Sequence, residues 1–474
     1  MAFLSTRHSW VSLLFRCVVV SFPLPHASPR TRAAILSFSS VAAFRICCLI
    51  RLRMNSVEHC DCVIIGGGPA GCSAASILAE QGHRVIVLER EKFPRYHIGE
   101  SLIPFTYPSL ERLGLVSRMR QSGFTKKYSV QFVAPSGHAS QPFYFFNRYD
   151  RETIAQTWQV LRSEFDEILM NHARDRGADV REEHAVEQVL REDGQYVGVR
   201  VRNSQGEVKE IRAPITIDAS GRDAVAATQN AWRRGDPKLN KVAVWTYYTG
   251  SKRDSGLDEG QTTVAFIPNK GWFWHIPQHN DRVSVGVVAE GKYLTRDGIK
   301  DAQTIFEREI PNNRWIQDRL STGTCTGEYW LTAEYTFRSE YSAANGLILV
   351  GDAYGFLDPV FSSGLMLALK SGVAGADAVH AALKAGDCSA ARFEDYSRTM
   401  RRSMENMRKL VYAFYDPNVS FRTVVEKYPE MNGALTDCLS GDMEKDYSAL
   451  HQALSEWTQV PDDLPHGKPM MAHA

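Results

Sequence analysis

The stretch Asp61-Cys-Val-Ile-Ile-Gly-Gly-Gly-Pro-Ala-Gly-Cys72 decides the fold of this chain. Its apolar run Val63–Ile65 predicts a short, buried strand of a parallel sheet. Gly66, Gly68 and Gly71 follow and match the pattern G-x-G-x-x-G. In that pattern the first glycine permits a tight turn, the second lets the backbone approach a pyrophosphate, and the third lets a helix pack on the strand.

The residues after the glycines complete a strand–helix–strand unit. Ser73–Glu80 predicts a helix, and Val85–Leu88 predicts a second buried strand that ends in Glu89. A carboxylate at that place suits the diol of a ribose, and the helix N-terminus would face the phosphates. The unit therefore predicts dinucleotide binding. A glycine turn in an unrelated α/β fold is the alternative.

The composition is that of an ordinary globular protein. Of 474 residues, 44% are hydrophobic and 23% are charged. Residues 1–53 contain seven Arg and no Asp or Glu, which leaves 48 basic against 54 acidic side chains in the rest of the chain. We therefore expect no nucleic-acid surface there. The nine cysteines include no C-x-x-C pair, which indicates a reducing, cytoplasmic location without disulfides or a metal site.

Residues 1–55 differ in kind from the rest of the sequence. They are rich in Arg, Ser and apolar residues, but Arg16 interrupts the apolar patches, so no run is long enough to span a membrane. We expect a disordered extension, or one assigned in error, with Met54 as the true start. A secretory signal or transit peptide is the alternative.

The nucleotide-binding pattern is interrupted and then resumes. Residues 240–335 are rich in β-branched and aromatic residues, which predicts a mostly antiparallel sheet, whereas Gly346–Asp352 returns to the parallel pattern. We predict an α/β fold: a Rossmann-like FAD/NAD(P)-binding domain built of three layers (ββα), interrupted by a mostly antiparallel β-sheet substrate domain and followed by a C-terminal helical region. The expected segments are 56–127, 158–235 and 336–385 for the FAD-binding domain, 128–157 for a sheet insertion, 236–335 for the substrate domain and 386–474 for the helical region.

Several short strands are expected between the two parts of the nucleotide-binding pattern. Val180–Arg181, Ala185–Arg191, Val197–Val201 and Ile211–Ala213 suggest a meander. Ile215–Asp218 predicts a further strand that ends in a turn.

Gly351-Asp352 narrows the dinucleotide to FAD. The pair follows an apolar strand about 285 residues after the first glycine of the glycine motif. A carboxylate at a strand end beside a helix N-terminus can accept hydrogen bonds from ribityl hydroxyls, which only a flavin carries. The alternative is an ordinary N-cap aspartate.

Two further motifs carry chemistry. Gly271–Pro277 contains Trp272 and Trp274 at alternate positions, so both indoles should lie on one face of a strand. Asp358–Gly364 places small residues before an apolar helix, where free backbone N–H groups can hold an anion. A packed aromatic strand and an ordinary helix cap are the respective alternatives.

With these motifs the chain resembles the flavin-dependent halogenases, which act on tryptophan, phenols or pyrroles. They belong to the FAD superfamily of p-hydroxybenzoate hydroxylases and geranylgeranyl reductases. The resemblance covers roughly residues 58–385. Trp272–Pro277 fits the family motif W-x-W-x-I-P, and Phe93–Ser101 is similar to the family's loop near the flavin. The family's essential lysine, in a G-F-x-x-K segment, falls on Lys127, with Lys126 as second choice.

The resemblance implies a set of site residues. Lys127, Trp272 and Trp274 would be catalytic, and Ser363 and Gly364 would bind halide through their amides. From residue type alone, a solvated surface lysine is the alternative for Lys127. The implied FAD-binding residues are Gly66, Gly68, Pro69, Ala70, Gly71, Glu89, Arg90, Arg95, Gly99, Glu100, Ser101, Arg162, Gly351, Asp352 and Pro359.

The resemblance also implies an activity. Reduced FAD, O₂ and chloride or bromide would yield hypohalous acid, which would travel through a tunnel to Lys127 and halogenate an electron-rich aromatic ring. A separate NAD(P)H flavin reductase would supply reduced FAD, because Asp218–Gly221 lacks the Asp-Gly pair of hydroxylases that bind NADPH directly. The small aromatic substrate would be free or tethered to a carrier protein.

The sequence departs from the family at two places. Tyr128-Ser129-Val130 replaces the small Gly-Ala pair usual in phenol- and pyrrole-acting members, and Phe361 replaces the glutamate of tryptophan halogenases. The second departure argues against free tryptophan as substrate. A hydroxylase, or a geranylgeranyl-reductase-like oxidoreductase without halogenation, is the main alternative. A flavin-binding protein that has lost catalysis is the other.

Overall fold

The computed structural model describes residues 57–268, 271–333 and 336–471. Predictions made for residues 1–55, including a start at Met54, lie outside the described residues.

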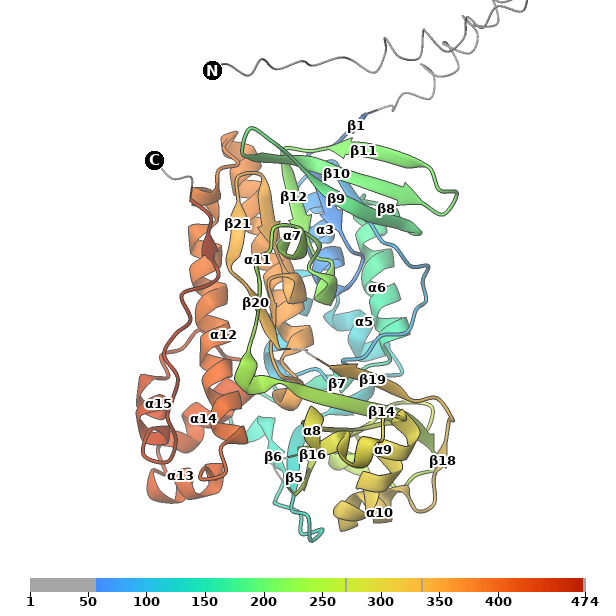
Figure 1. Cartoon of the computed structure of the whole chain (residues 1–474), viewed down its shortest axis with the longest axis vertical. Helices are drawn as coiled ribbons and strands as arrows, with labels where there is room; N and C mark the ends of the chain where they lie inside the picture. Colours follow the sequence, from blue (N-terminus) through green and yellow to red (C-terminus); the bar gives the residue numbers. More distant parts are fainter. Residues whose placement is uncertain (1–56, 269–270, 334–335, 472–474) are drawn as a thin grey trace, which may run out of the picture. The chain divides into compact units, whose positions relative to one another are not determined.

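The glycine stretch lies between two paired parallel strands, β2 (Cys62–Ile65) and β3 (Val85–Leu88), which are buried along their whole length. The helix between them, α3 (Pro69–Glu80), is labelled in Figure 1 and begins four residues before the predicted Ser73. Proline is favourable in the first turn because its missing N–H would have no intrahelical partner there. The helix therefore starts directly at the glycine turn.

β2 lies inside a sheet that is mostly parallel. Its order is β24–β21–β22–β12–β2–β3–β8 in the described part of the chain. β12, β22 and β8 continue the parallel arrangement, and β21 is antiparallel to β22. The strands not yet given are β8 (Asp179–Arg181), β12 (Ile215–Asp218), β21 (Tyr341–Ala344), β22 (Leu347–Leu349) and β24 (Lys468–Pro469).

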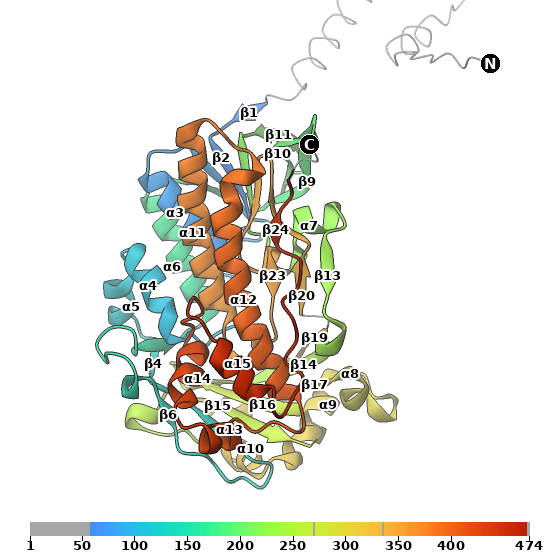
Figure 2. The same cartoon turned by 90° about the vertical axis from the view of Figure 1, so that its left-hand side faces the viewer.

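The expected ββα layering of the FAD-binding fold is confirmed (Figure 2). On one side of the parallel sheet, α3 packs against α6 (Arg162–Asp175) and α11 (Gly364–Ala385). On the other side lies a second sheet, which contacts β12 through β10. That sheet has the order β1 (Glu58–His59), β11 (Val208–Arg212), β10 (Gln195–Asn203) and β9 (His184–Glu192).

One strand prediction is wrong. Val180–Arg181 lies in β8, which pairs in parallel with β3, and not in the meander formed by β9, β10 and β11. β8 follows α6 directly, so α6 is the crossover helix of a further parallel unit. A three-residue strand has too little periodicity to reveal its partner.

The predicted, mostly antiparallel sheet is confirmed. β14, β17, β16 and β15 pair antiparallel in that order, and β5 joins β15 in parallel. Trp272 and Trp274 of β16 belong to the core shared with the FAD-binding sheet, whereas Phe273 packs in a second core against Phe306 of α9 (Ala302–Glu309). The strands are β5 (Ser129–Val133), β6 (Phe143–Tyr144), β14 (Lys241–Thr249), β15 (Thr262–Ile267), β16 (Gly271–Pro277), β17 (Arg282–Glu290), β18 (Thr324–Cys325) and β19 (Trp330–Ala333).

Small sheets and short helices connect these parts. β4 (Thr125–Lys127) pairs with β7 (Thr157–Gln159), and β20 (Phe337–Ser339) lies between β13 (Arg233–Gly235) and β23 (Gly355–Phe356). The connecting helices are α4 (Tyr107–Arg112), α5 (Val116–Gln121), α7 (Val225–Gln229), α8 (Gly291–Leu294), α9 (Ala302–Glu309) and α10 (Arg314–Leu320).

The C-terminal part is mainly helical, as predicted. α12 (Glu394–Tyr415) runs beside α11 in Figure 2, and three shorter helices follow. These are α13 (Phe421–Lys427), α14 (Met431–Leu439) and α15 (Ser448–Leu454). No helix in residues 57–268, 271–333 and 336–471 is long and apolar enough to cross a membrane. The predicted domain boundaries themselves stay predictions.

Candidate functional site

A cavity of about 390 Å³ lies where the glycine turn, the segment after β3 and the large antiparallel sheet meet. Most of the residues predicted to form the site line this one cavity. They are Gly66, Gly68, Pro69, Ala70, Glu89, Arg90, Arg95, Gly99, Glu100, Ser101, Arg162, Trp272, Trp274, Asp352, Pro359 and Gly364. Gly71, Gly351, Ser363 and Lys127 lie outside its lining.

Close backbone contacts require glycine at the turn. A Cβ on Gly71 would lie 2.0 Å from the carbonyl oxygen of Gly66, and one on Gly66 would lie 2.5 Å from that of Ala219. Gly66 also has a φ of 99°, which few other residues adopt. A Cβ on Gly351, which has a φ of 59°, would lie 2.9 Å from the Cβ of Ala70. Gly71 and Gly351 do not line the cavity, but they allow the residues that line it to pack closely.

Glu89 holds the glycine turn in place. Its carboxylate accepts hydrogen bonds from the backbone N–H of Gly67 at 2.7 Å and of Glu91 at 2.8 Å. The side chain is buried and also lines the cavity. Its predicted contact with a ribose stays a prediction.

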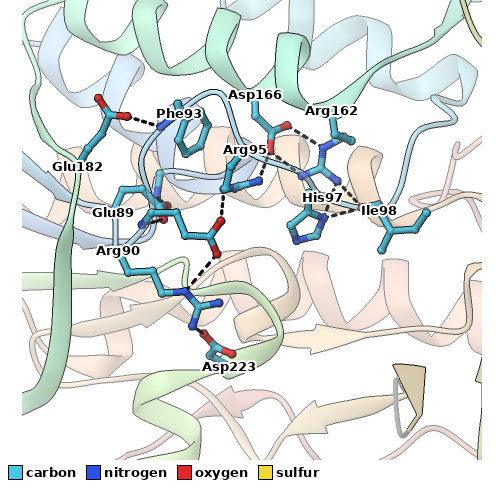
Figure 3. Close-up of polar contacts among 12 residues, drawn as sticks. Glu89, Arg90, Phe93, Arg95, His97, Ile98, Arg162, Asp166, Glu182 and Asp223 are labelled. Atoms are coloured by element: carbon cyan, nitrogen blue, oxygen red, sulfur yellow. Dashed lines mark hydrogen bonds and ion pairs between the residues drawn. The ribbon is translucent and has the colours of Figure 1, made fainter. Parts of the chain in front are cut away.

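A buried ion-pair network borders the cavity (Figure 3). Asp166 accepts two hydrogen bonds from Arg162, at 2.7 and 2.8 Å, and one from Arg95 at 3.1 Å. Burial alone would raise the pKa of Asp166, but Arg162 and Arg95 lower it overall. Arg162 Nη1 also binds the backbone of the 97–99 segment, and burial lowers the pKa of His97 to about 3. Arg162 is thereby fixed from two sides.

The carboxylate of Asp352 indicates whether the residues of the cavity fit FAD. Burial raises its pKa to about 6, and no described residue donates a hydrogen bond to its carboxylate. A carboxylate in this position would gain stability from hydroxyl donors such as those of a ribityl chain. Together with the glycine turn at the N-terminus of α3, Asp352 fits FAD.

Aromatic rings form the wall of the cavity on the large sheet. Trp272 and Trp274 have ring centroids 6.1 Å apart, and Trp245 lies 6.3 Å from Trp274. All three line the cavity. Trp330 stacks on Trp245 at 6.2 Å and on Tyr96 at 4.7 Å. The indoles predicted to share a face do so, within a larger aromatic stack.

The segment before α11 contacts this wall through one tyrosine. Tyr415 OH accepts a hydrogen bond from Trp272 Nε1 at 2.8 Å and donates one to Asp358 at 2.9 Å. Burial raises the pKa of Asp358 to about 6. Ser363 is the buried N-cap residue of α11, and its side chain makes no capping hydrogen bond. The backbone N–H groups of the first helical turn therefore receive no hydrogen-bond acceptor from the Ser363 side chain.

Lys127 is completely buried. Its Nζ donates to Ser101 Oγ at 2.8 Å and to the carbonyl of Leu102 at 3.0 Å, and lies 5.6 Å from the Phe145 ring. Burial lowers its pKa to about 7. The surface-lysine alternative is wrong for Lys127, whereas Lys126 is exposed. Because Ser101 lines the cavity, one hydroxyl separates the lysine amine from it.

Sequence reasoning missed several residues of the site. Asp166 lies four residues after Arg162 on α6, and this helical spacing was a usable signal. Thr262 and Tyr415 had no signal, because their roles depend on contacts between distant segments. The described residues hold no cluster of three or more His, Cys, Asp or Glu that could bind a metal ion.

Comparisons with known proteins agree with this geometry. A family model described as tryptophan halogenase matches residues 61–153 and 143–424. Flavin-dependent halogenase armH4 of Armillaria mellea is 32% identical over 365 residues, covering 71% of this chain and 68% of that protein. A 1H-pyrrole-2-carbonyl-(peptidyl-carrier protein) chlorinase of Pseudomonas fluorescens is 28% identical over 403 residues, covering 81% and 89%. The structure of flavin-dependent brominase Bmp2 has a TM-score of 0.76 at 26% identity and covers 84% of this chain and 98% of that chain.

The nucleotide-binding fold, its glycine turn and these relatives define an FAD-dependent enzyme of the oxidoreductase type. Within this class the chain belongs to the tryptophan halogenase family, that is, to the flavin-dependent halogenases. The predicted family membership is confirmed.

Proposed function

We propose that this halogenase oxidises a halide held at Ser363–Gly364 to hypohalous acid and delivers it through Lys127 to an electron-rich aromatic ring. The observation that carries the proposal is the complete burial of Lys127 behind Ser101 at the edge of the cavity. FAD, when bound, would supply the reductive activation of O₂ that oxidises the halide.

Lys127 suits this task because its amine can change protonation state near neutral pH. Desolvation disfavours the ammonium form and lowers the pKa to about 7. The neutral amine can attack the halogen of hypohalous acid, which forms an N–X bond and releases water. The ammonium form can instead hold hypohalous acid by a hydrogen bond. Either form would direct the halogen to a ring beside the lysine.

The start of α11 suits a halide. Ser362 has a left-handed φ of 56°, which turns the chain so that the helix begins at Gly364 beside the cavity. Backbone N–H groups at a helix start favour an anion. Both chloride and bromide are proposed as the anion.

A phenol- or pyrrole-type ring is the proposed substrate class. Phe361, at the position where tryptophan halogenases carry a glutamate, is buried and packs on Phe414 at 5.6 Å between centroids. Phe361 supplies no carboxylate at this position, which argues against free tryptophan as the substrate. The similarity to a carrier-protein chlorinase supports a tethered pyrrole as one form of the substrate.

The proposal includes a separate NAD(P)H flavin reductase as the source of reduced FAD. The proposal is based on the sequence Asp218–Gly221, where Ala219 and not a glycine follows Asp218. The carboxylate of Asp218 accepts hydrogen bonds from the backbone N–H of Ala226 at 2.7 Å and from the Ser220 hydroxyl. The cytoplasmic location stays a prediction.

The decisive experiment offers substrates to the full chain. We would incubate it with FAD, a flavin reductase, NADH and bromide or chloride. Phenols and pyrroles would be added both free and loaded on a carrier protein, with products read by mass spectrometry. We expect halogenated product from the wild type and at least a hundredfold less from Lys127→Met, which keeps the length of the side chain. FAD binding should be unchanged.

Lys126→Met is the matched control, because Lys126 is the exposed neighbour of Lys127 on β4. It should halogenate at the wild-type rate. Hydroxylated product that survives Lys127→Met would overturn the proposal and favour the monooxygenase alternative.

A further inference from the structure

A chain of hydrogen bonds leads from Lys127 to the wall of the flavin cavity. Lys127 Nζ lies 2.8 Å from Ser101 Oγ, and Ser101 Oγ lies 2.9 Å from Thr262 Oγ1. All three side chains are buried. Ser101 and Thr262 line the cavity, whereas Lys127 does not. The two hydroxyls therefore connect the lysine amine with the space assigned to FAD.

Gln159 restricts which atoms can donate and which can accept in this series of hydrogen bonds. Its amide nitrogen donates to the Gly260 carbonyl at 2.7 Å and to Thr262 Oγ1 at 2.8 Å. A carbonyl can only accept, so the nitrogen and not the oxygen of the amide must face this pair. Thr262 Oγ1 consequently accepts from Gln159, and its own proton can go only to Ser101 or into the cavity.

The hydrogen bonds between Lys127, Ser101 and Thr262 then have two arrangements of donors and acceptors, which differ in the protonation of Lys127. When Lys127 is an ammonium, it donates to Ser101, Ser101 donates to Thr262, and the Thr262 proton points into the cavity. When Lys127 is a neutral amine, Ser101 donates to the amine, and Thr262 donates to Ser101. Passing from one arrangement to the other moves one proton through the chain.

We infer that Ser101 and Thr262 are positioning residues that relay protons between Lys127 and the flavin cavity, an inference that rests on the proposed function of Lys127. When the ring carbon takes the halogen, the O–X bond breaks, a C–X bond forms, and the ammonium protonates the departing hydroxide to water. The Ser101 proton then moves to Nζ, and the Thr262 proton moves to Ser101. A hydronium ion in the cavity re-protonates Thr262, which balances the proton that the halogenated ring carbon releases to water. The relay itself changes only O–H and N–H bonds and transfers no electron.

The other contacts of Lys127 cannot serve this purpose. The Leu102 carbonyl holds no proton, and the Phe145 ring carries no exchangeable one. Lys127 forms no ion pair with any acidic side chain among the described residues, and burial lowers the pKa of its amine to about 7. The hydroxyl chain is what joins this amine to other proton carriers.

The test follows proton exchange at Lys127 in the full chain with FAD bound. Nitrogen-15-labelled lysine would be observed by NMR below pH 7, and the Lys127 signal assigned with Lys127→Arg. We expect Thr262→Val to slow hydrogen–deuterium exchange of the Lys127 Nζ protons at least tenfold, and Thr262→Ser to restore it. Thr262→Val should also lower the halogenation kcat about tenfold without raising the substrate KM.

Thr263→Val is the matched control. Thr263 is equally buried on β15, but its side chain points to the opposite face of the strand, so exchange and kcat should stay at wild-type values. If Thr262→Val does not fold, Thr262→Ala replaces it. Unchanged exchange in the folded Thr262 variant would overturn the relay, even if Lys127→Met abolishes halogenation. Full halogenation by Lys127→Met would instead overturn the proposed function of Lys127 and with it the catalytic use of the relay, whereas slowed exchange in Thr262→Val would still support the proton path itself.

Discussion

The amine of Lys127 titrates near neutral pH in the folded chain, because burial lowers its pKa to about 7. In the unfolded chain a lysine titrates near pH 10.4. Between these two values the unfolded state binds one more proton, so the free energy of unfolding should rise with pH by about 1.4 kcal/mol per pH unit on account of this residue. Urea unfolding of wild type and Lys127→Met, measured from pH 6 to pH 10, checks this.

The informative quantity is the difference between the two proteins. It should be constant below pH 7, where Lys127 is charged in both states, and should favour the wild type increasingly above pH 7. The same series with Lys126→Met should show no trend, because Lys126 is exposed. A difference between wild type and Lys127→Met that does not vary with pH would contradict the burial argument.

Two aspartates of Figure 3 should differ in their effect on stability. Asp166 is buried between Arg162 and Arg95, whereas Asp223 pairs with Arg90 and about half of each of these two side chains is exposed. Asp166→Ala should lower the free energy of unfolding by about 3–5 kcal/mol, because it leaves a buried guanidinium unpaired. Asp223→Ala should cost no more than about 1 kcal/mol. Chemical denaturation of both variants measures these losses. Equal losses of unfolding free energy in the two variants would refute the difference between the buried and the exposed ion pair.

At the residue scale, sequence alone predicted chemistry that depends on local patterns. Trp272 and Trp274 could be placed on one face of a strand because side chains alternate. The burial of Lys127 could not be derived from residue type, since lysines are rarely buried and its neighbour Lys126 is exposed. Thr262 was beyond prediction, because its contact with Ser101 joins segments 161 residues apart.

At the scale of elements, the turn between β2 and α3 has the least tolerance for change. Gly71→Ala would place a Cβ 2.0 Å from the Gly66 carbonyl and push the helix away from the strand. We expect a loss of about 1–3 kcal/mol of stability and of most FAD binding. Flavin absorbance of the purified protein and thermal unfolding measure both.

Gly235→Ala provides the control for this change. Gly235 is exposed on β13, and a Cβ there would meet no atom within 4 Å. Its flavin content and unfolding temperature should match the wild type. Normal flavin binding by Gly71→Ala would show that the turn can relax.

Elements with clear periodicity were predicted well, and short ones were not. The strands of the large sheet follow an alternation that sequence displays directly. The early start of α3 was missed because glycine and proline are poor helix formers inside a helix, although proline is favoured in the first turn. β8 was misplaced because pairing partners are set by the whole sheet and not by three residues.

At the scale of the whole described unit, Asp437 ties the C-terminal helices to the segment after β6. It lies on α14, is almost fully buried and accepts hydrogen bonds from Arg148 at 2.7 and 2.8 Å, Tyr149 at 2.6 Å and Lys445 at 2.9 Å. Burial would raise the pKa of Asp437, but these donors lower it overall. Nothing in the sequence pairs these residues, which lie up to 289 positions apart.

Asp437→Asn should therefore cost about 1–2 kcal/mol at pH 7, a reduced value because Arg148 and Lys445 are half-exposed and can be solvated. Since the folded-state pKa is lowered, the advantage of the wild type should be full above about pH 5 and begin to fall near pH 4, where the carboxylate of the unfolded chain takes up a proton. It should be lost as the pH falls further, through the lowered folded-state pKa. Urea unfolding at several pH values tests this, with hydrogen exchange of the α14 amides as a local measure. An advantage that persists unchanged at pH 3 would contradict it.

The indoles of Trp245, Trp272 and Trp274 line the cavity that fits FAD, and they are three of the nine tryptophans in the chain. Indole emission overlaps flavin absorption, so light absorbed by these rings passes to a flavin bound beside them. Their fluorescence should be quenched when the flavin enters and return when it leaves. The wall of the cavity thus gives the protein a built-in optical signal, with which flavin exchange can be timed without any added label.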